Sequence, residues 1–81
     1  MPKYLIYTPA NFPEVFNAVK SLGDATGMLP SFVALSCEAD IDEVTDRVRT
    51  VSGPGESLVV EVVNAHYSGP GQLSQLGAFL R

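Results

Sequence analysis

The feature that most constrains the fold is a strand pattern that runs directly into a helix pattern near the N-terminus. Tyr4 to Thr8 is a short apolar and aromatic run ended by Pro9, which is typical of a strand. From Asn11 onward, apolar residues recur at helical spacing, which predicts an amphipathic helix with Asn11 as its N-cap. Gly23 stands where the C′ residue of this helix is expected.

A hairpin is predicted after this helix. Residues 24–28 favour a short strand, and Leu29-Pro30 favours a turn. Residues 31–37 form a second strand whose side chains alternate between two faces. One face carries Phe32, Ala34 and Ser36, and the other carries Val33, Leu35 and Cys37.

A second helix and a fourth strand follow the hairpin. Asp40 is the predicted N-cap of the helix, with Glu43 at the capping-box position and an i,i+4 pair from Glu43 to Arg47. The sequence Gly53-Pro54-Gly55 ends the helix. Leu58 to Val63 is continuous and rich in β-branched residues, which indicates a strand.

The order strand, helix, strand, strand, helix, strand predicts an α+β fold, the ferredoxin-like βαββαβ sandwich, as a single domain over residues 1–81. Leucines at helical spacing predict a short C-terminal helical tail over about residues 72–81. Right-handed connections place both main helices on one face of the sheet. Residues 58–63 are apolar on both sides, so we expect a second subunit or the tail to cover the open face.

The composition favours a small homodimer. Of the 81 residues, 46% are hydrophobic and 17% are charged, which is apolar for so short a chain. The net charge of −4 argues against strong, unspecific binding of nucleic acid. The single cysteine, Cys37, forms no internal disulfide, and no apolar run reaches the roughly 20 residues that span a bilayer. We therefore expect a cytoplasmic protein with no membrane partner.

Four segments carry a resemblance to a known family. The runs YLIY, AVKSLG, DEVTDRVR and SLVVEV, between Tyr4 and Val63, resemble the small SinR-family proteins related to Cas2 and to VapD-like toxins. The resemblance implies a ferredoxin-like homodimer in a defence, mobile-element or toxin–antitoxin context. It also implies DNA or RNA as a partner, since Cas2 binds DNA and members of the group have metal-dependent nuclease or ribonuclease activity.

The chain departs from that family at the end of the first strand. Relatives have Tyr-Asp where this chain has Tyr7-Thr8-Pro9, and Mg²⁺ prefers carboxylate oxygens. We therefore expect no catalytic residue, metal site or cofactor, and predict a non-catalytic nucleic-acid-associated or assembly role. Two alternatives remain open: a metal-dependent nuclease or ribonuclease with an altered site, and a protein-interaction module without nucleic acid.

Three residues are candidates for a polar site, namely Asn11, Glu61 and His66. Glu61 is the only charge in its strand and is expected on the open face of the sheet. His66 lies in a loop without a second histidine or a cysteine at ligand spacing. The candidates for nucleic-acid contacts are Lys3, Lys20, Arg47 and Arg49.

Two further patterns are read as structural. Arg47 and Arg49 point about 200° apart on a helix, so they form no tight basic patch. The tetrapeptide SGPG occurs at Ser52–Gly55 and Ser68–Gly71, on either side of the fourth strand. Neither copy has the lysine and following helix of a phosphate-binding loop, so we interpret both as turns.

Overall fold

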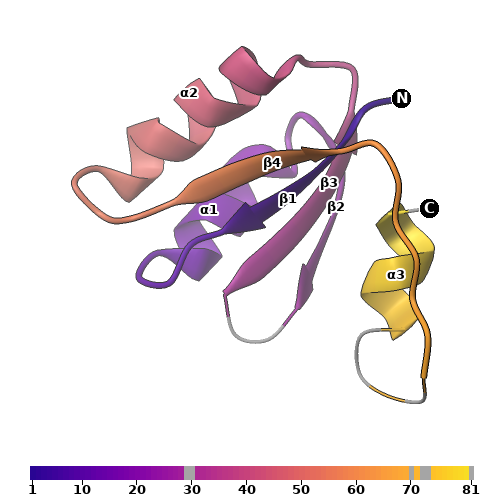
Figure 1. Ribbon diagram of the computed structural model, residues 1–81. Coiled ribbons are helices and arrows are strands. Elements are labelled where there is room, and N and C mark those ends of the chain that lie inside the picture. The colour runs from indigo at the N-terminus through magenta and orange to yellow at the C-terminus, as the bar shows by residue number, and fades with distance from the viewer. Residues whose placement is uncertain (29–30, 70, 72–73, 81) are drawn as a thin grey trace.

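The computed structural model describes residues 1–28, 31–69, 71 and 74–80 (Figure 1). The predicted turn at Leu29-Pro30, and Leu73 and Arg81 of the tail, lie outside the described residues. The elements, in chain order, are β1 (Lys3–Tyr7), α1 (Phe12–Val19), β2 (Gly23–Met28), β3 (Phe32–Cys37), α2 (Ile41–Ser52), β4 (Leu58–Val62) and α3 (Ser74–Leu80).

The strands form one four-stranded sheet in the order β2-β3-β1-β4. Every neighbouring pair is antiparallel, including the predicted β2–β3 hairpin. The prediction of an α+β fold is therefore confirmed, with β1 and β3 in the middle of the sheet and β2 and β4 at its edges.

Helices cover the two faces of the sheet to different extents. The helices α1 and α2 lie together on one side, and the short α3 lies on the other (Figure 1). Side chains that alternate inward from β1 and β3 meet the apolar stripes of α1 and α2, as the period-2 and period-3.6 patterns require. Among the described residues, nine that are each at most 1% exposed make this core: Tyr4, Ile6, Val15, Val19, Val33, Leu35, Cys37, Val44 and Val48.

The end of α1 differs from the prediction. The helix stops at Val19 with Lys20 as its C-cap, and Gly23 opens β2 instead of serving as the C′ residue. The backbone of Gly23 has no positive φ. A Cβ at Gly23 would collide with the carbonyl oxygen of Ser36 on β3. Glycine is needed at this position because two strands approach closely, not because a helix ends there.

The ends of α2 follow the prediction. Asp40 caps the helix, since its Oδ1 accepts a hydrogen bond from the backbone N–H of Glu43 at 2.9 Å. Gly53 ends the helix with φ of 57°, a conformation that glycine adopts without steric cost.

Arg47 of α2 has its partners outside this helix, because its Nη1 donates to the Ser21 hydroxyl, just after α1, at 2.9 Å. Within the described residues, no ion pair joins it to Glu43.

The tail forms the predicted short helix over residues 74–80, and α3 contacts β3. The segment between β4 and α3 returns against this helix at Gly77. A Cβ at Gly77 would lie 2.5 Å from the Cβ of Tyr67, so the absence of a side chain permits the contact. No helix in the described part of the chain has the length and apolar character to cross a membrane.

Candidate functional site

Asn11 occupies the N-cap position of α1, but its side chain does not cap the helix. Its Nδ2 instead donates a hydrogen bond to the carbonyl oxygen of Ser52, at 3.1 Å. The predicted capping role is therefore wrong. Asn11 joins the beginning of α1 to the end of α2, which is a structural task.

Glu61 lies on the face of β4 opposite to the one predicted. It stands across from Tyr4 in the β1–β4 register, and Tyr4 belongs to the helix-covered core. Directly opposed residues share one face of a sheet, so Glu61 is on the side of α1 and α2. The carboxylate is exposed at the margin of that face.

The phenol of Tyr4 is the titratable group that this environment perturbs. Its hydroxyl donates to the carbonyl oxygen of Ala39 at 2.7 Å, and the side chain is 1% exposed. Burial raises the pKa of Tyr4 above its ordinary value of 10.0, and the negative charge of Glu61 adds to this effect. With its pKa raised, the phenol of Tyr4 stays protonated and keeps its hydrogen bond to Ala39, so we assign Tyr4 a structural role.

The three predicted polar residues do not converge. Glu61 and the following segment with His66 lie near the beginning of β1, because β4 runs antiparallel to it. Asn11 follows the other end of β1. The described residues contain no group of three or more His, Cys, Asp or Glu side chains that would hold a metal ion.

Thr8 occupies the position where the family resemblance places an aspartate. It is fully buried, and its N–H donates to the carbonyl oxygen of Ser31 at 2.9 Å. Its hydroxyl oxygen has no hydrogen-bond partner among the residues that the structure describes. The backbone of Thr8 therefore continues the pairing beyond β1, and its side chain offers no carboxylate.

The four basic candidates are distributed over three surfaces. Lys20 and Arg47 lie near each other, since Arg47 bonds Ser21 next to Lys20. Arg49 lies on the side of α2 that faces β4. Lys3 pairs with Val62 and Ser36 on the other face of the sheet. Such a distribution gives no continuous basic surface within the described part of one copy of the chain.

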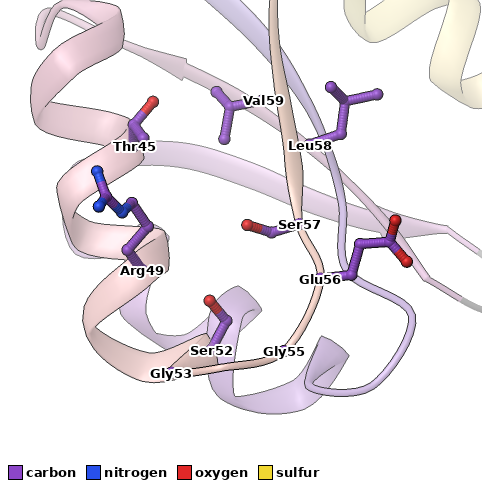
Figure 2. Close-up of a pocket in the computed structure, with 9 residues that line it drawn as sticks. All are labelled: Thr45, Arg49, Ser52, Gly53, Gly55, Glu56, Ser57, Leu58 and Val59. Atoms are coloured by element: carbon purple, nitrogen blue, oxygen red, sulfur yellow. The ribbon is translucent and has the colours of Figure 1, made fainter.

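A groove between α2 and β4 was not predicted from the sequence. It has a volume of about 520 Å³ and lies above the loop that joins the two elements (Figure 2). Its walls are Thr45, Arg49, Ser52, Gly53, Gly55, Glu56, Ser57, Leu58 and Val59. Of the two SGPG copies, the one at Ser52–Gly55 contributes described residues to the groove, although its sequence predicts only a turn.

The second surface feature is an apolar strip on the sheet face opposite α1 and α2. We define the strip as Leu5 and Tyr7 of β1 with Leu58, Val60 and Val62 of β4, which face the same side in the register. Leu58 is 58% exposed, Val60 is 42% exposed and Tyr7 is 36% exposed. The Tyr7 ring also packs on Phe32 of β3, with centroids 5.0 Å apart.

No protein-family model, curated protein or solved structure matches this chain. The resemblance to the SinR, Cas2 and VapD-like group therefore stays a prediction from the sequence.

Proposed function

We propose that this chain is a ferredoxin-like, non-catalytic module that forms a homodimer through the apolar strip. The strand order β2-β3-β1-β4, with α1 and α2 on one side, supports the ferredoxin-like assignment. This order arises from two interleaved βαβ units, β1-α1-β2 and β3-α2-β4. Each right-handed crossover leaves room for one strand of the other unit between its own two parallel strands.

The exposure of the apolar strip is the observation that carries the proposal. Fully burying a valine or leucine side chain contributes about 1.5–3 kcal/mol, so leaving Leu58 and Val60 in water forgoes a large part of that. Monomeric soluble proteins rarely leave a contiguous apolar patch uncovered. In the described residues, α3 contacts β3 and leaves the β4 side of the face open.

A second copy of the chain fits this strip for reasons of charge. The one charged residue of β4, Glu61, faces the opposite side, so two strips can meet without burying like charges. Among the described strand residues, the charged ones on the strip's side of the sheet are Lys3 and Asp24, which are both in register with Ser36 at one end. An apolar centre with charge at its margin is the usual arrangement of a protein interface. A two-fold axis would bring the same strip from each copy together.

Sedimentation velocity at micromolar concentrations tests the proposal. We expect a dimer for the native chain and a folded monomer for Val60→Glu, because the substitution places a carboxylate in the centre of each strip. Val51→Glu is the matched control, since Val51 is 37% exposed on α2, away from the strip. A native chain that sediments as a monomer, or equal dimerisation in both variants, would refute the proposal.

Nucleic-acid association remains a prediction of the resemblance and is tested separately. Phosphate contacts make binding weaken steeply with salt, so a gel-retardation assay at low and high salt is informative. Retardation that salt abolishes would add a nucleic-acid partner to the assembly role. No retardation at low salt would leave the module without that partner.

A further inference from the structure

The groove between α2 and β4 contains hydrogen-bond donors that have no partners among the described residues. Ser52 is only 4% exposed, and its hydroxyl oxygen is buried without a hydrogen bond to any described residue. The side chains of Thr45, Arg49 and Ser57 make no hydrogen bond or ion pair with any described residue. A buried polar group without a partner loses its hydration without compensation, so such groups are rare without a reason.

These donors line one groove. Figure 2 shows the hydroxyl groups of Ser52 and Ser57 pointing from opposite walls into the space between α2 and β4. Arg49 stands on α2 one turn before Ser52 and supplies a cation at the same groove. The Glu56 carboxylate points away from the groove, on the far side of β4 (Figure 2).

Two of the carbonyl groups at the end of α2 accept hydrogen bonds from other residues. The carbonyl oxygen of Ser52 accepts hydrogen bonds from Gly55 N–H at 2.9 Å and from Asn11 at 3.1 Å. The carbonyl oxygen of Arg49 accepts from Gly53 N–H at 3.0 Å. The partial negative charge of the helix end is thus partly neutralised, and the unpartnered side chains are donors.

We propose that this groove binds a phosphoryl group carried by a small molecule. A guanidinium and hydroxyls from two elements form charge-assisted and neutral hydrogen bonds to several oxygens of one anion. A carboxylate has two oxygens in one plane, whereas a phosphoryl group offers three in a pyramid. The volume of about 520 Å³ exceeds what one phosphoryl group needs and is within the range of small-molecule sites.

Backbone amide NMR during titration with inorganic phosphate tests the site. We expect saturable shifts at Gly53, Gly55 and Ser57, with acetate and chloride at equal ionic strength causing no saturable change. Arg49→Gln weakens phosphate binding by about tenfold or more, since it removes a charge-assisted contact. The matched control is Arg47→Gln, which removes the same charge from the same helix but faces α1.

A second variant separates binding from folding. Ser52→Ala removes a hydroxyl that bonds no described residue, so we expect an unchanged or higher melting temperature without phosphate and weaker phosphate binding. Val60 does not line the groove and lies on the opposite face of β4 from Val59, so Val60→Glu retains phosphate binding even if the proposed dimer fails. Shifts that rise linearly with phosphate, equal affinity in Arg49→Gln and the native chain, or equal binding of acetate would overturn the proposal.

The source of the phosphoryl group is settled by a parallel titration. A phosphorylated small molecule, glycerol phosphate, is compared with a single-stranded oligonucleotide at equal phosphate concentration. We expect the monoester to shift the same three amides in a saturable way that Arg49→Gln abolishes. Saturable binding of the oligonucleotide alone would overturn the small-molecule assignment.

Discussion

The two faces of the sheet differ in how far one chain completes them. On the face toward α1 and α2, Ile6, Val33 and Leu35 are fully buried. On the other face, Leu58 and Val60 of the edge strand are exposed, although they are equally apolar. The helix-covered face is finished by the chain itself, whereas the face of the apolar strip is finished only in part, by α3.

The difference follows from the lengths of the helices on the two faces. Two helices of 8 and 12 residues are long enough to cover one face, because a helix rises about 1.5 Å per residue. The tail supplies a helix of only 7 residues for the other face. A small domain buries a limited share of its surface, and the apolar residues in excess collect on the uncovered face.

The first prediction concerns the completed face and has the largest expected effect. Leu35→Ala leaves a cavity among the core residues, so we expect the free energy of unfolding to fall by about 3 kcal/mol. Urea denaturation followed by circular dichroism measures the change. A loss under about 1 kcal/mol would contradict the tight packing inferred for this face.

The second prediction concerns the partial cover of the other face. Gly77→Ala places a methyl group against Tyr67, which we expect to destabilise the α3 docking by about 1–3 kcal/mol. Hydrogen exchange of the α3 amides measures the loss, since local opening exposes them. Ala78→Gly is the control, because Ala78 is exposed on the same helix. Equal protection in the Gly77→Ala variant and the native chain would show that α3 does not depend on this contact.

The third prediction uses Tyr4, at the margin of the completed face. Tyr4→Phe removes the hydrogen bond to Ala39, and we expect a loss of about 1 kcal/mol at neutral pH. The raised pKa means that the folded state holds the phenol proton to higher pH than the unfolded state. The contribution of this proton to stability is therefore complete below pH 10.0 and is lost as the pH rises above it.

The pH dependence is checked by urea denaturation of both proteins at about pH 8 and about pH 11. The native chain loses more stability between these values than Tyr4→Phe does, because only the native chain has the Tyr4 hydroxyl. The other tyrosines are present in both proteins and contribute equally to both losses. Equal losses would show that the Tyr4 hydroxyl is not held in its protonated form by the fold.

Local signals made much of this fold predictable. The Asp40 cap, the stop at Gly53 and the alternation of β3 depend on neighbours in sequence, and each appears where it was expected. The strand at residues 58–62 was equally clear, because no other state suits such a β-branched run.

Contacts between distant segments explain what the sequence did not predict. Asn11 bonds Ser52, 41 residues away, and Gly23 is fixed by its approach to Ser36. The predicted face of Glu61 was wrong because its strand is apolar on both sides, so only the pairing with β1 decides which face the side chain takes. The groove could not be predicted from the sequence either, because its lining residues come together only when β4 lies beside α2.

The last prediction compares one leucine on each face. Leu58→Ala removes the same atoms as Leu35→Ala, but Leu58 is 58% exposed in the single chain. At dilute concentration, where the monomer dominates, we expect its effect on unfolding to stay within about 0.5 kcal/mol. At concentrations where the proposed dimer forms, binding adds to the stability of the native chain by mass action, and Leu58→Ala loses part of this gain. Thermal unfolding across a hundredfold range of protein concentration measures both regimes. If the difference in melting temperature between the native chain and Leu58→Ala stays constant with concentration, Leu58 faces solvent in the assembled protein too.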